Sequence, residues 1–302
     1  MPSDTDQDFR FALVDVFTDD VFFGNPLPVV TNADNLTTEA MQRIAREFNQ
    51  SETTFVLKPS RISASRRLRA FTNLGAEVFG AGHHTLGAWW WLAESGDLSL
   101  YDGRNIFLQE AGDSLLQVEI AVEKGRPVMI SMGQDTPHFG PEFSDRPRLA
   151  QALGLDLYEV AVDIPAKVVS TGAAHLMVAL VNRQAIDRCR PDAVHLAAIV
   201  DPLRAEGCYV FSYNPCADGT LAYARFFNPA GGIIWEDPAS GGAAAPLVCH
   251  LVAENRASKD TAFFVEQGTA MGRPSLIEVR VSNAAVTVSG RCATVAEGSI
   301  RI

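Results

Sequence analysis

The chain repeats itself once, and this internal repeat constrains the fold more than any other feature of the sequence. Thr54-Phe55-Val56 corresponds to Val210-Phe211-Ser212, and Arg69-Ala70-Phe71 corresponds to Arg225-Phe226-Phe227, in both cases 156 residues later. In each half a helix and a strand are expected before these segments, and a glycine-rich turn with an apolar helical segment after them. A self-similarity of this size predicts two like domains rather than an array of short repeats.

The two glycine-rich turns are the best candidates for a binding site. The first contains Ala81-Gly82-His83-His84 and leads into Trp89-Trp90-Trp91, and the second is Ser240-Gly241-Gly242. A turn at the start of a helix directs free N–H groups at one point, so Ala81, Gly82, Ser240, Gly241 and Gly242 are expected to hold a carboxylate. Corresponding turns of two like domains are expected to face each other across a cleft. The three tryptophans spread around a helix, which predicts a buried helix rather than a stacking site.

Composition excludes several classes of partner. The chain has 302 residues and a formal charge of −11, which argues against nucleic acid or an anionic membrane surface as the main partner. No apolar run reaches the length of a membrane span, and the N-terminus is unlike a secretion signal. Five cysteines are widely spaced without Cys-x-x-Cys pairs, as in a cytoplasmic protein with reduced thiols.

Three titratable residues are candidates for catalysis. Glu52 begins an apolar strand, where partial burial would raise the pKa of its carboxyl toward the range of a general acid or base. His83 lies in the first turn of a helix, whose dipole favours a neutral imidazole that acts as hydrogen-bond partner or proton relay. Asp237 lies before the second turn, where it is expected opposite His83. The alternatives are a strand-end acid for Glu52, a helix cap for His83, and an acid that complements the helix dipole for Asp237.

No motif indicates a cofactor or a metal. There is no P-loop, and no Gly-x-Gly-x-x-Gly follows a strand in a βαβ unit. His83 and His84 are adjacent and cannot both face one side of a helix, so they are not a metal pair. His138, His175, His195 and His250 have no ligand spacing and are interpreted as structural or surface residues.

The domain boundary is expected in the segment 134–145, which is rich in Pro, Gly and polar residues. This placement gives an N-terminal domain over residues 1–135, which the last strand, about 288–302, is expected to complete. Residues 136–287 then form a C-terminal domain that repeats the first.

Six short motifs, in order along the chain, resemble the PhzF-like (phenazine biosynthesis-like) family. They are Val14-Asp15-Val16-Phe17-Thr18, Gly24-Asn25-Pro26-Leu27, Ser51-Glu52-Thr53-Thr54-Phe55-Val56, Ala81-Gly82-His83, Glu236-Asp237-Pro238, and Gln267-Gly268 followed by Gly272-Arg273-Pro274-Ser275. The resemblance implies a diaminopimelate-epimerase-like α+β fold of two similar domains, each a curved antiparallel sheet around a central helix. It also implies cofactor-independent proton transfer at carbon, a homodimer, and catalytic roles for Glu52, His83 and Asp237.

The sequence departs from the family at two informative places. His84 replaces a common proline, and Gly242 replaces a serine whose hydroxyl is available to substrate. The related two-thiol racemases carry a cysteine at each helix start, where this chain has Ala81 and Ser240. A single carboxylate that moves a proton on one face needs no second base, so an isomerase acting on a small carboxylated metabolite is favoured. An epimerase or racemase of an amino or imino acid, and a non-catalytic protein that binds small acids, remain the alternatives.

Overall fold

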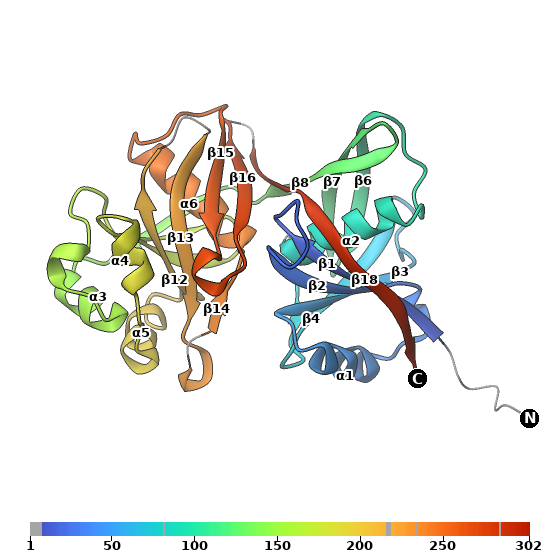
Figure 1. Cartoon of the computed structure of the whole chain (residues 1–302), viewed down its shortest axis with the longest axis horizontal. Helices are drawn as coiled ribbons and strands as arrows, with labels where there is room; N and C mark the ends of the chain where they lie inside the picture. The colour runs from blue at the N-terminus through green and yellow to red at the C-terminus, as the bar shows by residue number, and fades with distance from the viewer. Residues whose placement is uncertain (1–7, 81, 216–218, 234, 284) are drawn as a thin grey trace, which may run out of the picture. The chain divides into compact units, whose positions relative to one another are not determined.

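Two compact units make up the chain (Figure 1). The computed structural model describes residues 8–80, 82–215, 219–233, 235–283 and 285–302. The first unit combines Met1–Gly133 with Ser289–Ile302, and the second is Gln134–Val288. The last strand, β18 (Cys292–Arg301), returns to the first unit and pairs antiparallel with β1 (Asp8–Val16).

The sheet of the first unit is mainly antiparallel. Its strands pair in the order β18, β1, β2, β3 and β4; β4 then pairs with both β5 and β6, and β6 continues to β7 and β8. Two pairs, β2 with β3 and β4 with β6, are parallel, which the sequence had not indicated. The strands after β1 are β2 (Asn25–Val30), β3 (Glu52–Leu57), β4 (Arg66–Thr72), β5 (Glu77–Val78), β6 (Gly103–Ala111), β7 (Ser114–Glu123) and β8 (Arg126–Gln134).

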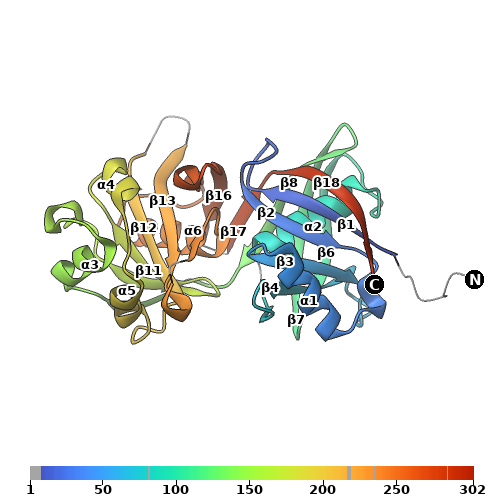
Figure 2. The same ribbon diagram turned by 60° about the horizontal axis from the view of Figure 1, so that its bottom comes forward.

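Helix α2 (His83–Glu94) forms the core of the first unit, and Figure 2 shows it among the strands of that unit. It contacts β1, β2, β3, β7 and β18. Trp89 is fully buried and donates from Nε1 to Oε1 of Gln109 at 2.7 Å, and Trp91 is buried as well, whereas Trp90 is partly exposed. The prediction of a core helix is therefore confirmed, with only one side of the helix near solvent.

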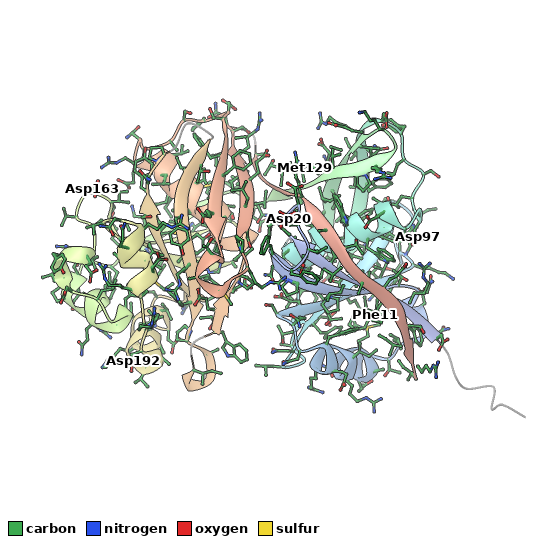
Figure 3. All side chains as sticks on the ribbon, in the orientation of Figure 1. Phe11, Asp20, Asp97, Met129, Asp163 and Asp192 are labelled. Atoms are coloured by element: carbon green, nitrogen blue, oxygen red, sulfur yellow. The ribbon has the colours of Figure 1, made fainter. Side chains whose placement is uncertain are left out.

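Helix α1 (Thr38–Phe48) covers the outer face of the same sheet. Thr37 caps its first turn by accepting from the Ala40 N–H, and Met41 and Ile44 turn inward at helical spacing. Phe11 of β1, which Figure 3 labels, packs on Phe48 with ring centroids 5.1 Å apart. An apolar helix face on an apolar strand face thus closes the second, smaller core of this unit.

The second unit repeats this arrangement strand by strand. Its strands pair in the order β9, β10, β11, β12 and β13; β13 pairs with both β14 and β15, and β15 continues to β16. Again two pairs are parallel, β11 with β12 and β13 with β15. The strands are β9 (His138–Glu142), β10 (Lys167–Ser170), β11 (Ala174–Ala179), β12 (Gly207–Tyr213), β13 (Thr220–Asn228), β14 (Trp235–Asp237), β15 (Ala262–Gln267) and β16 (Ser275–Val281), with β17 (Val286–Gly290) crossing into the first unit.

Helix α6 (Gly241–Ala253) takes the place of α2 in the second unit. It is buried along most of its length and contacts β10, β11 and β16. Three helices pack on the other face of the sheet, where Leu149, Ile186 and Leu196 meet Cys208 and Val210 (Figure 2). These helices are α3 (Arg146–Leu153), α4 (Arg183–Arg188) and α5 (Ala193–Val200).

A matching arginine–glutamate pair fixes the hairpin before each central helix. The Arg69 guanidinium donates from Nε to Glu77 at 2.7 Å, and Arg225 donates in the same way to Glu236 at 2.8 Å; each pair has a second, parallel hydrogen bond. Each guanidinium also lies over a phenylalanine two residues on, Phe71 or Phe227. Bidentate pairs of this kind have strong directional preference, so both hairpins are held in the same geometry.

One part of the sequence repeat is displaced by a residue. Phe71 pairs with Thr53 and Phe227 pairs with Cys208, so the strand partners correspond at 155 residues rather than 156. Phe55 accordingly corresponds to Val210, and both face the outer helices of their units. The proposed match of Phe55 with Phe211 was wrong. Both segments carry a phenylalanine at nearly the same position, but side chains alternate between the two faces of a strand, and Val210 is the residue that faces the same way as Phe55.

The segment expected as a linker is partly regular. Residues 138–142 form β9 and pair with β10. The side chains of β9 are mostly exposed, which is common in a strand at the edge of a sheet and does not prevent backbone hydrogen bonding. Cys189, Cys208, Cys249 and Cys292 are free and buried, and Cys216 lies outside the described residues. Among the helices that the structure describes, none is long and apolar enough to cross a membrane.

Candidate active site

Glu52 and His83 meet in the first unit. Glu52 begins β3 and His83 begins α2, and their atoms Oε2 and Nε2 lie 3.3 Å apart. The glutamate side chain is 20% exposed and the histidine side chain 7% exposed. The two atoms make a close contact but are not aligned as a hydrogen bond. Since such contacts often tighten only when substrate binds, the distance is compatible with a catalytic pair.

His83 is neutral at physiological pH. Burial and, to a lesser extent, the neighbouring His84 together lower the pKa of its imidazole to about 3. The sequence had suggested the helix dipole as the cause of a neutral imidazole, whereas removal from water is the larger effect. A neutral imidazole beside a carboxylate can donate or accept one proton, depending on its tautomer.

The start of α2 is tied to β3 by its neighbours. The Thr54 hydroxyl donates to the His84 carbonyl at 3.2 Å, and His84 Nε2 lies 3.3 Å from the Gly80 carbonyl. The His84 ring fills the space beside Gly82, so a side chain at Gly82 would collide with it. His84 is therefore structural, as expected, and burial lowers its pKa to about 4.

The second unit has no counterpart of Glu52. The matching hairpins place Gly207, at the start of β12, where the first unit has Glu52 at the start of β3. A side chain at Gly207 would collide with the Phe227 carbonyl and the Phe226 ring. A carboxylate at this strand position is thus present in only one of the two repeats.

Asp237 and the start of α6 form a polar cluster in the second unit. Asp237 ends β14, and its charge together with burial raises the pKa of Tyr209 well above its ordinary value, burial being the larger cause. Ser240 is the N-cap of α6, and its N–H donates to Oε1 of Gln267 at 3.2 Å. The next two N–H groups, of Gly241 and Gly242, have no intrahelical acceptor because they lie in the first turn.

A proline shapes this first turn. Pro246 lies inside α6 and has no N–H, so the Gly242 carbonyl lacks its usual partner four residues on. Burial lowers the pKa of the His175 imidazole of β11 to about 4, and an interaction with the Gly242 backbone opposes this shift. The His175 side chain therefore lies beside the first turn of the helix.

The predicted residues therefore fall into two groups, one in each unit. Glu52, His83 and Gly82 lie together in the first, and Asp237, Ser240, Gly241 and Gly242 lie together in the second; Ala81 lies outside the described residues. Residues 8–302, apart from the gaps given above, contain no group of three His, Cys, Asp or Glu side chains that could hold a metal ion. Sequence reasoning missed Tyr209, Gln267 and Thr54, although Gln267 and Thr54 each stand in one of the six motifs.

A sequence profile of phenazine biosynthesis-like proteins matches residues 14–298. The chain belongs to the PhzF family. A trans-2,3-dihydro-3-hydroxyanthranilate isomerase from Pseudomonas aeruginosa is 34% identical over 296 residues, which cover 96% of this chain and 98% of that protein. Relatives from this family carry isomerase names, and this chain is an enzyme of the isomerase class.

Solved structures show the same fold. A PhzF-family phenazine biosynthesis protein from Bacillus anthracis superposes with a TM-score of 0.86 at 26% identity, covering 98% of this chain and 100% of that one. A hydroxyproline epimerase from Agrobacterium vitis superposes with a TM-score of 0.67 at 10% identity, covering 98% and 93%. The fold is therefore the diaminopimelate-epimerase-like fold of two similar units that the sequence predicted.

Proposed function

We propose that this PhzF-family chain is a cofactor-independent isomerase that moves a proton between two carbon atoms of a small carboxylated metabolite. Glu52 is the general acid and base. The observation that carries the proposal is the contact between Glu52 and the buried, neutral His83, at a position where the second unit has Gly207. One acid on one face suits a reaction that removes a proton from one carbon and delivers a proton to another on the same face.

The reaction needs no redox partner. The Glu52 carboxylate takes a proton from carbon, and the electron pair of the broken C–H bond spreads into an adjacent double bond and carboxylate. The protonated Glu52, whose side chain is 20% exposed and can exchange its proton with water, then protonates a different carbon, so that atoms and charge balance. His83 orients the Glu52 carboxylate, and its neutrality keeps it from holding that carboxylate in a strong ion pair.

The second half of the proposal concerns the substrate carboxylate. The N–H groups of Gly241 and Gly242 at the start of α6 suit an anion, as helix N-termini do. Asp237 is proposed as a hydrogen-bond partner of the substrate or as a proton relay. Substrates of this class are unsaturated or cyclic acids, and the substrate in the name of the P. aeruginosa relative is one candidate.

Deuterium incorporation tests the proposal. The enzyme is incubated in D₂O with a panel of small unsaturated and cyclic acids, including trans-2,3-dihydro-3-hydroxyanthranilate, and each product is followed by NMR. We expect deuterium at carbon and a shifted double bond, and a loss of about 10²–10⁴-fold in rate in Glu52→Gln. Glu39→Gln, in the first turn of α1, is the control that keeps the wild-type rate.

The remaining outcomes separate the alternatives. Deuterium at a stereocentre with inverted configuration would identify an epimerase instead. Tight binding of an acid without any exchange would indicate a non-catalytic binding protein. Full turnover by Glu52→Gln would show that another group moves the proton.

A further inference from the structure

A buried glutamine links the two functional segments of the second unit. Gln267, at the end of β15, is fully buried and donates from Nε2 to the Asp237 carbonyl at 2.7 Å. Its Oε1 accepts from the Tyr209 hydroxyl at 2.7 Å and from the Ser240 N–H at 3.2 Å. One amide therefore bridges the end of β14 and the N-cap of α6.

The partners leave the amide only one orientation. Tyr209 is fully buried beside Asp237, and both effects favour its protonated form, so its hydroxyl is a donor at any pH the protein meets. The Ser240 N–H is a donor as well, and the Asp237 carbonyl can only accept. A rotated amide would set its NH₂ group against the Ser240 N–H and its oxygen against the Asp237 carbonyl, at the cost of two buried hydrogen bonds.

The backbone around the amide is held equally firmly. Gly268 has φ 79° and its Cα lies so close to the carbonyls of Arg273 and Pro238 that no side chain fits. The Ser275 hydroxyl shares its proton between the Arg273 carbonyl at 2.9 Å and the Pro238 carbonyl at 3.2 Å. Consecutive carbonyls, of Asp237 and Pro238, are thus fixed by side chains from β15 and β16.

We propose that Gln267 is a positioning residue, which fixes Asp237 and the first turn of α6 in the arrangement that binds the substrate. This inference rests on the proposed function. It also restricts which groups hold the carboxylate: the Ser240 N–H is already occupied by Gln267, so the Gly241 and Gly242 N–H groups remain. The sequence had treated all three turn residues alike.

Two substitutions of Gln267 test the proposal. Gln267→Leu removes all three hydrogen bonds, and we expect kcat to fall about 10–100-fold at every pH. Gln267→Glu keeps the shape of the side chain, but its ionised form has no proton for the Asp237 carbonyl. Once protonated, the introduced carboxyl donates there and accepts from Tyr209 and Ser240, as the amide does.

The expected signature is a rescue by acid. At pH 7.5 Gln267→Glu should resemble Gln267→Leu, and at pH 5.5 its kcat relative to wild type at the same pH should recover at least tenfold. Tyr209 and Asp237 are the titratable groups facing this position, and Glu266 and Arg183 pair on the opposite face of β15. Because wild type contains all four, a titration present only in Gln267→Glu belongs to the introduced carboxyl.

Gln109→Glu is the matched control. Gln109 is also a fully buried glutamine on a strand, bonded to Trp89 and Thr85 in the first unit. The Gln109→Glu variant should lose about as much stability as Gln267→Glu. Its amide NMR signals of Ser240, Gly241 and Gly242 should nevertheless not change with pH. In Gln267→Glu the same signals should titrate.

The NMR signals separate failure of this inference from failure of the proposed function. If the Gln267→Glu signals titrate but wild type turns over no acid, the positioning role stands and the proposed function fails. If wild type turns over an acid through Glu52 while Gln267→Glu keeps the wild-type kcat or shows no pH-dependent ratio, the positioning role is overturned.

Discussion

Nε2 of His83 lies 3.3 Å from Oε2 of Glu52, and the imidazole of that pair is buried and neutral. A protonated histidine at this distance would form an ion pair and lower the basicity of the carboxylate. Burial of His83 removes that attraction, because it makes the charged imidazole unfavourable. The pair is thus arranged for hydrogen bonding and orientation rather than for charge.

Replacing His83 should therefore slow catalysis without changing how activity depends on pH near neutrality. We expect His83→Leu to lower kcat about 10–100-fold, less than Glu52→Gln, because orientation is lost while the proton-moving group remains. The wild-type profile of kcat against pH should show no inflection near 6.5 from His83, whose pKa is about 3. A wild-type inflection near 6.5 that disappears in His83→Leu would contradict this assignment.

Gly242 is predicted to control which acids are accepted. A Cβ at Gly242 meets no atom within 4 Å outside its own helix, so Gly242→Ser should fold with a free energy of unfolding within about 0.5 kcal/mol of wild type. The added hydroxyl should improve kcat/KM for hydroxylated substrates such as trans-2,3-dihydro-3-hydroxyanthranilate. Kinetics on paired hydroxylated and deoxy acids measure this effect; equal changes for both would rule out a role in selectivity.

As the pH is lowered, the fold should begin to lose stability at pH values well above those at which carboxylates titrate. His83, His84 and His175 have pKa values of about 3, 4 and 4 in the folded state, below the 6.5 of a free histidine. Between these values the unfolded chain binds more protons than the folded chain, so stability falls as the pH falls from 6.5, until the folded histidines protonate too. The slope should approach about 1.4 kcal/mol per pH unit for each histidine.

Urea denaturation at pH 7.0, 6.0 and 5.0 measures this loss before Glu110 and Glu159 contribute. Their pKa values are lowered by hydrogen bonds and charges, so their stabilisation is lost only below about 4.5. His84→Pro should reduce the slope by up to about 1.4 kcal/mol per pH unit, the contribution of one histidine, since proline is accepted in the first turn of a helix. The exposed His195→Gln should leave the slope unchanged; a change there would point to another source.

The interaction of His175 with the Gly242 backbone predicts coupling between two positions that are distant in the chain. His175→Leu should lower the free energy of unfolding by about 1–3 kcal/mol, because it removes the interaction of the imidazole with the Gly242 carbonyl. In a Pro246→Ala background the alanine N–H can donate to that carbonyl, so the same replacement should cost less. A double-mutant cycle measures the difference, and strictly additive effects would show that His175 does not serve this carbonyl.

The sequence was most informative where residues act through local geometry. The Arg69 and Arg225 motifs marked the repeat correctly because each pairs with a glutamate only a few residues along the chain. The tryptophan helix was recognisable because no polar face interrupts it. Glu52 and His83 were predicted because one begins a strand and the other begins a helix. In the structure that helix, α2, contacts that strand, β3.

Features that depend on tertiary partners were not predictable. The contact of Gln267 with Tyr209 joins residues 58 positions apart, and nothing in a single sequence indicates which strands lie side by side. The one-residue displacement of β12 was hidden because Phe211 and Val210 are both apolar and buried, so either face could have been the inner one. The parallel pairs likewise require knowledge of which strands are neighbours.

The absence of room at Gly207 also bears on how the two halves of this chain can diverge. After a gene duplication both copies begin with the same options, yet the Phe226 ring and the Phe227 carbonyl leave the second copy no space for an acid at this position. A new carboxylate there would first require the neighbouring strand to move. We therefore expect engineered or natural variants that gain a second acid to place it elsewhere in the second copy, which makes the division of labour between the repeats difficult to reverse.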